Sequence, residues 1–439
     1  MSNIELALSM LALLLVLMSI RIPIAIAMLG CGALGYTILA GFPTTLNYLS
    51  TVPYSKFSTY DLSVVPLFLL MGELATRAGI TTELFRTCNT WVGQFKGGLA
   101  MASVSGCAAF GAICGSSLAT ASTMGQVALP EMKKNNYAGG LAAGCLAAGG
   151  TLGILIPPSM VLIIFAVLTE QNISKMFIAA FVPGILAAGG YILAIAIYVR
   201  IFPKSGPKGE KTTWGQKFRS TRDVWHITLI FLIVLGGIYL GFFTPTEAAA
   251  VGVILTGILA LTHGKLTFGQ FKDSIIRTAV SSAMIFMIIL GADLFSVFIA
   301  LTNLPNLGAE LLLNAQMSPY LILALMLLSY FILGCFMDSL AMILLTIPIY
   351  FPIIVAMDFG MSVEDTGIWF GILALVVVEV GLITPPVGMN VFIINSFDKS
   401  LSLKESFRGV VPFILSDFSR VILLVLFPPI TLALVHLLS

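Results

Sequence analysis

Two short segments that contain proline pairs are the positions where this sequence is best suited to bind a ligand. Gly153-Ile-Leu-Ile-Pro-Pro158 and Gly381-Leu-Ile-Thr-Pro-Pro386 each lie in the middle of a long apolar stretch. A proline pair removes two backbone N–H donors and crowds the preceding turn, so each stretch is predicted to be a helix that breaks there. Because a break leaves carbonyl oxygens without helical partners, these oxygens are available to hold a cation.

Two further segments, called the tips below, combine glycine with hydroxyl or carboxylate side chains. The first tip covers 111–117 and the second covers 334–339. Glycine reaches left-handed turn conformations that can direct several carbonyls to one point. Sodium is a hard cation and prefers oxygen ligands. One interpretation is that the small residues only let helices pack closely. Because tip and break both occur twice, we favour ion and substrate binding, with each tip facing one break.

The candidate ligands follow from this pairing. The first sodium site is predicted to contain Gly115, Ser117, Thr151, Gly153 and Pro157. The second sodium site is predicted to contain Gly334, Asp338, Glu379, Gly381 and Thr384. Substrate contacts are predicted at Ser116, Ser117, Asp338, Ser339 and Asn390.

Asp338 is the most prominent single candidate. An ionisable group deep in an apolar segment costs several kcal/mol unless it is paired or hydrated, and its aligned partner Ser116 is neutral. We favour a substrate or sodium contact over a structural hydrogen bond. Glu379, which aligns with Thr151, could bind sodium, titrate or cap the broken helix. Asn390 could face the cavity or form an interhelical hydrogen bond.

The composition places the chain in a lipid bilayer. Of its 439 residues, 58% are hydrophobic and 10% are charged, whereas soluble domains carry roughly a quarter charged residues. The net charge of +2 gives no indication of nucleic acid binding. The sequence contains no phosphate-binding loop of the Walker type, no HExxH motif and no CxxC pair. We therefore expect neither an enzyme nor an organic cofactor.

Hydropathy predicts an all-α polytopic membrane protein with ten spans and two re-entrant hairpins. The spans are predicted near 4–20, 22–41, 61–78, 138–168, 176–199, 226–243, 246–262, 278–302, 366–396 and 410–438. The stretches 98–130 and 319–357 each begin and end on the same side of the membrane, so each is predicted to be a helical hairpin with a tip at its turn. Two proline-broken spans complete the predicted site.

The distribution of basic residues orients the chain. The segment 200–222 holds seven Lys or Arg residues and is placed in the cytoplasm by the positive-inside rule. Both termini are then expected in the periplasm. In both halves the order is span, hairpin, broken span and span, with the sides exchanged, which is an inverted repeat. The tip alignment matches 116–119 with 338–341. Two broken spans in corresponding halves are typical of a secondary transporter.

The domain prediction follows from the repeat. Residues 1–60 form scaffold helices, and 61–199 form the first transport repeat with hairpin 98–130. Residues 200–277 contain a cytoplasmic loop, scaffold helices and an arm, and 278–439 form the inverted second repeat with hairpin 319–357. The short basic segments 79–97 and 263–277 are predicted to be interfacial arms.

The sequence resembles the large membrane subunit of tripartite ATP-independent periplasmic (TRAP) transporters over essentially its whole length. The resemblance is carried by Phe243–Gly252, 106–117, Gly153–Pro158, the tip at Asp338 and Gly381–Pro386. It implies a sodium-coupled importer of a bacterial inner membrane that moves its repeats as an elevator. It also implies two partners, a small four-helix membrane subunit and a periplasmic substrate-binding protein. By the family pattern, the tips would hold sodium and face the substrate.

Family substrates are mostly organic anions. The hydroxyl-rich tips favour sialic acid, with a C4-dicarboxylate next. No arginine lies in either tip or break, so helix N-termini are the expected anion-binding groups. One alternative is a sodium-driven carboxylate symporter that needs no binding protein. A second alternative, from another class, is an ion channel, and a membrane scaffold without transport is third.

Overall fold

The computed structural model describes the chain except residues 1, 21, 265, 305–306, 308–316 and 439. Within the described residues, the only regular structure besides helices is one isolated antiparallel bridge between Lys96 and Lys208. The predicted all-α fold is therefore confirmed.

The helices up to residue 201 form the first group. They are α1 (Asn3–Ser19), α2 (Ile24–Ala40), α3 (Phe42–Phe57), the 3-10 turn η1 (Tyr60–Ser63), α4 (Val64–Ala78), α5 (Ile80–Val92), α6 (Gly98–Cys114), α7 (Ser117–Lys134), α8 (Gly139–Leu155), α9 (Met160–Leu168) and α10 (Ile173–Ile201). The second group contains α11 (Trp214–Asp223), α12 (Trp225–Tyr239), α13 (Pro245–Thr262), α14 (Phe268–Leu301), α16 (Pro319–Gly334), α17 (Ser339–Val355), α18 (Val363–Gly381), α19 (Met389–Phe397), α20 (Leu403–Leu426) and α21 (Pro429–Leu438).

Both predicted hairpins are present, as α6/α7 and α16/α17. The first turns through Gly115, whose φ of 65° lies in the left-handed region, and α7 then begins at once. The second has a longer turn between Gly334 and Ser339. Both predicted broken helices are present as well. The pair α8/α9 bends by 42° at its break, and residues 382–388 separate α18 from α19. The bond within each proline pair is cis.

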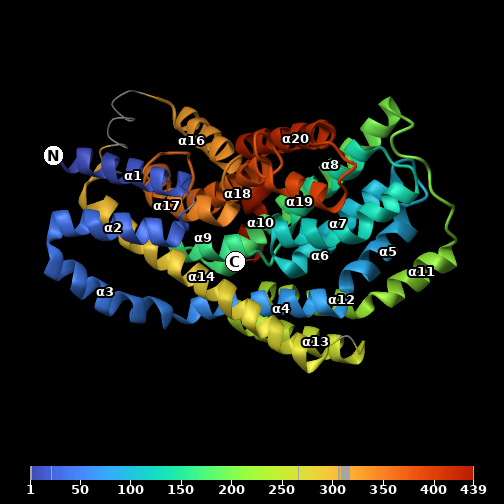
Figure 1. Ribbon diagram of the computed structural model, residues 1–439, viewed down its shortest axis with the longest axis horizontal. Helices are drawn as coiled ribbons and strands as arrows, with labels where there is room; N and C mark the ends of the chain where they lie inside the picture. Colours follow the sequence, from blue (N-terminus) through green and yellow to red (C-terminus); the bar gives the residue numbers. More distant parts are fainter. Residues whose placement is uncertain (1, 21, 265, 305–306, 308–316, 439) are drawn as a thin grey trace.

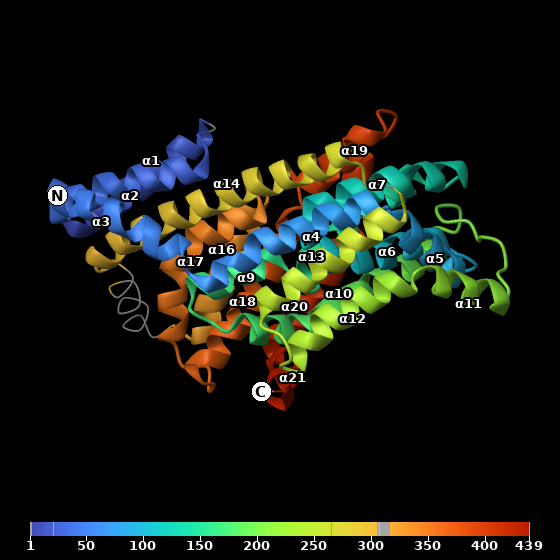
Figure 2. The ribbon, with the colours of Figure 1, turned by 90° about the horizontal axis from the view of Figure 1, so that it is seen from below.

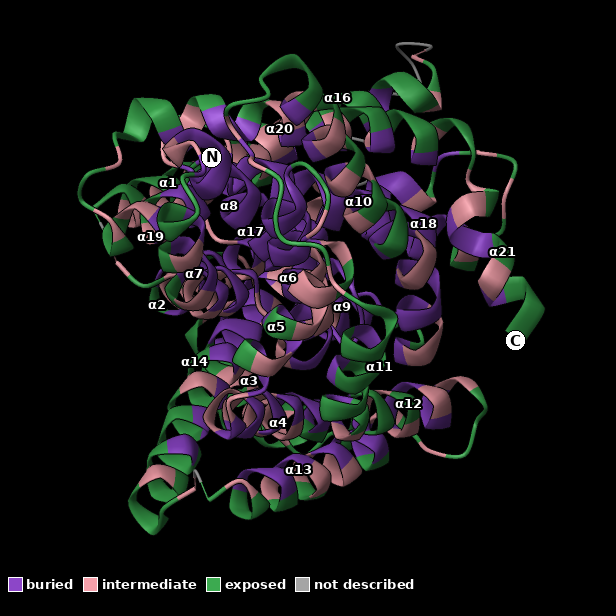
Figure 3. Ribbon diagram, turned by 90° about the vertical axis from the view of Figure 1, so that its right-hand side faces the viewer, coloured by how far each residue is buried: buried purple, intermediate pink, exposed green. Residues whose placement is uncertain are grey.

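The helices form two layers. The elements α2, α4, α13 and α14 lie side by side along one edge of the molecule, with α3 and α12 beside them (Figures 1 and 2). The hairpins, broken helices, α10 and α20 form the larger body above that layer (Figure 3). Burial is concentrated in this body, where α8 and α18 are buried over almost their whole length.

The inverted repeat appears in the packing. The helix α2 packs on α14, as α13 packs on α4. The second helix of each hairpin packs against the far half of the opposite broken helix, so that α7 contacts α19 and α17 contacts α9. The helix α8 contacts α20, and α18 contacts α10. Each repeat therefore completes the packing of the other.

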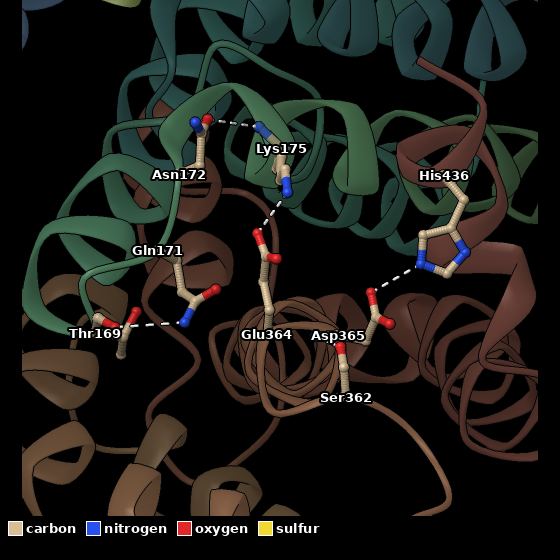
Figure 4. A network of polar contacts seen from close by, with 8 residues as sticks. All are labelled: Thr169, Gln171, Asn172, Lys175, Ser362, Glu364, Asp365 and His436. Carbon is tan, nitrogen blue, oxygen red and sulfur yellow. Dashed lines mark hydrogen bonds and ion pairs between the residues drawn. The ribbon is translucent and has the colours of Figure 1, made fainter. Parts of the chain in front are cut away.

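Loops that the charge pattern assigns to one side of the membrane are in contact with each other. At one end Lys133 forms an ion pair of 2.7 Å with Asp398, and its hydrogen bond lowers the pKa of Asp398 to about 2. At the other end Lys175 pairs with Glu364 at 2.6 Å, and the ring of His436 lies 2.9 Å from Asp365 (Figure 4). The second cluster joins α10, α18 and α21.

The structure differs from the predicted elements at four places. The helix α3 was not among the predicted spans, and α11 lies where the sequence predicts a loop. The predicted arm 263–277 and span 278–302 merge in α14, because no proline interrupts the sequence of this helix, so the domain boundary predicted at 277/278 falls inside it. The predicted span 410–438 is two helices, because a third proline pair, Pro428-Pro429, separates α20 from α21.

Apolar length supports several membrane crossings. Within the described residues, four helices are long and apolar enough to span a bilayer, namely α10, α13, α14 and α20, and up to seven spans result if each of three bent pairs counts as one. The shorter apolar helices include α6, α16 and α17, which belong to the hairpins. Many leucines and isoleucines are exposed on the outer helices, for example Leu8, Ile38 and Leu193, as expected for a surface that faces lipid.

We predict that Gly381→Val destabilises the protein, because a Cβ at this position would lie 2.5 Å from the backbone of Gly334. The expected loss is about 1–3 kcal/mol of unfolding free energy, as for other overpacked sites. Thermal unfolding of the protein in detergent measures it. Gly236→Val in α12 is the control, because no atom lies within 4 Å of its Cβ position. Equal unfolding temperatures for the two variants would contradict this packing.

Candidate functional site

The first tip lies directly on the first break. A Cβ on Gly111 would lie 2.4 Å from the Cα of Gly153, so only two glycines allow the backbones to approach this closely. A Cβ on Gly115 would lie 3.0 Å from the carbonyl oxygen of Pro158. The turn of hairpin α6/α7 therefore faces the unpaired backbone between α8 and α9.

The second tip lies on the second break in the same way. A Cβ on Gly334 would lie 3.1 Å from the Cα of Gly381 and 3.0 Å from the carbonyl oxygen of Val378. Hairpin α16/α17 thus faces the end of α18. Because both contacts are made between glycines of equivalent elements, the two halves place their tips and breaks alike.

One buried carboxylate connects the two tips. Glu379, near the end of α18, accepts a hydrogen bond from Ser117 through one oxygen and from Ser339 through the other, at 2.7 Å for Ser339. The two serines are the first residues of α7 and α17 and are aligned in the repeat. All three side chains are buried. Glu379 therefore contacts one predicted serine from each repeat, Ser117 from the first and Ser339 from the second.

Ser116 and Asp338 occupy equivalent positions beside this carboxylate. Each is the N-cap of the second hairpin helix. The Ser116 hydroxyl accepts from the Ala119 N–H at 3.4 Å, and the Asp338 carboxylate accepts from the Ala341 N–H at the same distance. The structural role that the sequence left open for Asp338 is thus present. The cap does not use all of its acceptor capacity, because a carboxylate can accept about four hydrogen bonds.

Two predicted sodium ligands, Thr151 and Thr384, use their hydroxyls in other hydrogen bonds. The Thr151 hydroxyl donates to the Ala148 carbonyl of its own helix α8 at 2.6 Å and lies 3.1 Å from the Tyr191 hydroxyl of α10. The Thr384 hydroxyl donates to the Val380 carbonyl at 2.7 Å. A Cβ on Gly153 would lie 2.8 Å from the Ser116 carbonyl oxygen and 2.4 Å from the Thr120 hydroxyl oxygen. The Ser116 carbonyl and the Thr120 hydroxyl therefore both lie at the first break. The threonine whose hydroxyl lies beside Gly153 is Thr120 and not the predicted Thr151.

Pro157 stands within the first break, next to Pro158. Asn390 lies one residue inside α19 and is fully buried. Its side-chain amide donates to the Ala147 carbonyl at 3.1 Å, which joins α19 to α8 of the other repeat. Its side-chain oxygen is buried and has no hydrogen-bond partner among the described residues. Because unpaired buried oxygens are rare, this one is available to a ligand. Asn390 thus forms the interhelical bond and also retains a free acceptor.

A second buried polar network lies beside the first and was not predicted. In α20, Asp417 and Arg420 form an ion pair of 2.7 Å. The Tyr191 hydroxyl donates to Asp417 at 2.7 Å and contacts Thr151. The helix α20 packs against α18, which carries Glu379. The sequence signal was available, since the predicted span 410–438 contains two opposite charges three residues apart, and ionisable residues inside spans are functional candidates.

The arrangement is suited to holding a small charged ligand. The N-termini of α7 and α17 point toward Glu379, and each carries a partial positive charge. Carbonyl and hydroxyl oxygens at the breaks are suited to a hard cation. Among the described residues there is no cluster of three or more His, Cys, Asp or Glu side chains for a transition metal. The site therefore offers separate groups for an anion and for a cation.

Apolar helices, two hairpins and two broken helices that meet at one buried polar centre define a membrane protein of the secondary transporter class. The sequence matches the family described as tripartite ATP-independent periplasmic transporter, DctM component, over residues 11–430. The chain belongs to this family. The resemblance noted in the sequence is thereby confirmed.

Known proteins of this family are similar over most of their length. The chain is 35% identical to the C4-dicarboxylate TRAP transporter large permease protein DctM of Pseudomonas aeruginosa, covering 91% of each chain. It is 30% identical to the sialic acid TRAP transporter large permease protein SiaM of Vibrio cholerae, covering 92% of this chain and 93% of that one. The crystal structure of the Alcanivorax borkumensis YdaH transporter has a similar fold, with a TM-score of 0.65, 14% identity and coverage of 92% and 96%.

We predict that Glu379 couples energetically to the two tip serines. Glu379→Ala leaves both hydroxyls without an acceptor and should lower the unfolding free energy by about 2–5 kcal/mol. Ser117→Ala/Ser339→Ala should be destabilising in the wild type and nearly neutral when Glu379 is already alanine, because the hydroxyls then have no partner to lose. Thermal unfolding of the four proteins measures this. Ser396→Ala, at an exposed position in α19, is the control. Additive effects would rule out the connection.

Proposed function

We propose that this chain is the permease of a sodium-coupled importer that carries an organic carboxylate across a bacterial inner membrane. Family membership supports the transport class. The observation that carries the proposal is the single carboxylate of Glu379, which holds Ser117 and Ser339 from the two hairpins. A transporter must not open both gates at once. Because Glu379 is hydrogen-bonded to both hairpin tips, movement of one hairpin affects the other.

Sodium coupling is supported by the oxygen atoms at the two breaks. At the first break the Ser116 carbonyl and the Thr120 hydroxyl lie beside Gly153. At the second, the Val378 carbonyl lies beside the glycine contact of tip and break. In the proposed cycle each break holds one sodium ion, and the bound cations offset the negative charge that the substrate carboxylate brings toward Glu379 and Asp338.

The two-layer architecture supports an elevator movement. In this proposal the layer of α2, α4, α13 and α14 stays fixed in the membrane, while the body that contains hairpins and broken helices moves along it. The fixed layer thus includes α4 and α14, which begin the two predicted transport repeats, so the moving part is smaller than those repeats. Both layers contribute elements of both repeats, and direct contacts between them are made mainly by α4 with α6 and by α14 with α17. The first hairpin thus meets the fixed layer through its first helix, whereas the second hairpin meets it through its second helix.

The proposed substrate is an organic carboxylate, with a C4-dicarboxylate now placed before sialic acid. The reason for favouring a polyhydroxylated acid was the hydroxyl content of the tips. In the structure Ser116 caps α7, and Ser117 and Ser339 donate to Glu379, so these hydroxyls are already engaged. The relative at 35% identity is named for C4-dicarboxylates and that at 30% for sialic acid, which points the same way.

The proposed assembly has three parts. The family name describes a tripartite periplasmic transporter of which this chain is one component. We propose that the others are a small four-helix membrane subunit and a periplasmic binding protein that delivers the substrate. The basic segment 200–222 then lies in the cytoplasm and both termini in the periplasm. The alternatives are a symporter that works without a binding protein and an ion channel. Reconstitution in proteoliposomes distinguishes both from the proposed assembly.

We predict that the charge of Asp338 is needed for transport and that its cap is not. Asp338→Asn keeps a good N-cap and should leave the unfolding temperature near that of the wild type, yet abolish sodium-driven uptake. Asp338→Ala should abolish uptake and cost about 1 kcal/mol as well. Ser318→Ala removes the N-cap of α16, at the end of the hairpin far from the tip, and is the control for cap loss. Normal uptake kinetics in both Asp338 variants, at matched protein amounts, would refute the assignment.

We predict that uptake requires both the binding protein and a sodium gradient. Proteoliposomes that contain the two membrane subunits should take up labelled C4-dicarboxylate only when the binding protein is added outside and sodium is higher outside than inside. Labelled sialic acid is measured in parallel. Uptake without the binding protein would favour the simple symporter, and ionic currents that do not depend on the organic anion would favour a channel.

A further inference from the structure

The base of the first hairpin carries a short loop held in place by backbone hydrogen bonds. The N–H of Gly97 donates to the Gly206 carbonyl, and the N–H of Ala138 donates to the Ser205 carbonyl, both at 3.0 Å. Lys96 and Lys208 face each other directly in an isolated antiparallel bridge. The loop position is thus determined by the backbone and brings two lysines together.

These lysines line a basic pocket. The pocket has a volume of about 410 Å³ and is lined by Gln94, Phe95, Lys96, Lys208 and Lys211, with no carboxylate. Among the described residues, none of its three lysines takes part in an ion pair. Like charges that face each other directly across a bridge destabilise it. An anion in the pocket would remove this repulsion.

A second cavity extends the positive surface. It measures about 520 Å³, shares Lys208 with the basic pocket, and adds Arg86 and Lys134. It also contains Glu131 and Glu210, so its charge is more balanced. The strongest anion site is therefore the basic pocket itself, with Arg86 and Lys134 at its edge.

Exposed aromatic side chains occur in the pocket, at Phe95, and on the neighbouring helices α11 and α12. The helices α5 and α11 pack together through a hydrogen bond from the Thr87 hydroxyl to the Ser220 carbonyl. Lys217 lies over the rings of Trp91 and Trp214, at 5.7 and 5.1 Å from their centroids. The outer side chains at this end are Phe95, Trp214, Phe218 and Trp225, between 53% and 69% exposed. Tryptophan beside lysine is typical of the headgroup level of a bilayer.

We propose that the basic pocket binds the phosphate of an anionic phospholipid. The residues that line the pocket follow α5 or precede α11, and these two helices lie side by side at one end of the molecule (Figure 1). There its lysines can reach a headgroup phosphate, and the exposed aromatic rings lie against the adjoining glycerol and upper acyl chain. A soluble anion would account for the lysines and would leave the exposed rings unexplained. Basic pockets between membrane helices bind anionic headgroups elsewhere. This inference rests on membrane insertion and is independent of substrate and sodium coupling.

The test uses the full chain purified in a neutral detergent and depleted of lipid. Phosphatidylglycerol should raise the unfolding temperature of the wild type, and phosphatidylcholine should not, because a ligand that binds only the folded state stabilises it. In Lys96→Gln/Lys208→Gln/Lys211→Gln the phosphatidylglycerol concentration for half the effect should rise on the order of a hundredfold, since each basic residue contributes about a fivefold factor.

Two variants serve as controls. Lys272→Gln/Lys399→Gln/Lys404→Gln removes the same charge from exposed positions outside the basic pocket and should respond to phosphatidylglycerol like the wild type. Lys96→Arg/Lys208→Arg/Lys211→Arg keeps the charge and should also respond. An equal response in the glutamine variant of the pocket would overturn the proposal. Equal stabilisation by inorganic phosphate would overturn the lipid assignment.

Discussion

The carboxylate of Glu379 is the point on which the centre of this protein depends. It is buried among apolar helices, where an unpaired charge or acceptor would cost several kcal/mol. The cost is offset because each oxygen accepts a hydrogen bond from a serine hydroxyl of a different hairpin. These contacts fix the first residues of α7 and α17, so the helix N-termini converge on the same point. The glycine contacts between tips and breaks then follow, because the hairpins cannot reach Glu379 unless the backbones approach closely.

The second buried network has a different function in the architecture. Asp417 and Arg420 lie on one helix, and a buried ion pair by itself adds little stability. Through Tyr191 and Thr151, however, this pair joins α20, α10 and α8, which belong to both repeats. The helix that carries this pair, α20, also packs against α18, which carries Glu379. The repeat positions that differ in sequence, Thr151 and Glu379, therefore serve two connected networks, one toward the tips and one toward the outer helices.

The side chains at the buried centre differ from those at the exposed end that contains α5 and α11. The centre relies on hydrogen bonds between few polar groups in an apolar surrounding, where each unpaired acceptor, such as the Asn390 oxygen, is available to a ligand. The exposed end relies on lysines and exposed aromatic rings, which are stable where water and lipid headgroups mix. The proposed transport site and the proposed lipid site thus lie at opposite extremes of burial within one chain.

The sequence by itself determined the helical class, both hairpins, both proline-broken helices and the inverted repeat, because apolar length and proline position act locally. It also identified Ser117, Ser339 and Glu379 as candidates. Only the tertiary structure decided that the three form one contact, since their separation of up to 262 residues carries no local signal. The same holds for Thr151, whose partner on α10 lies outside its own helix, and for Lys96 and Lys208, which loop pairing brings together. Local patterns determine the elements, whereas packing determines which polar groups meet.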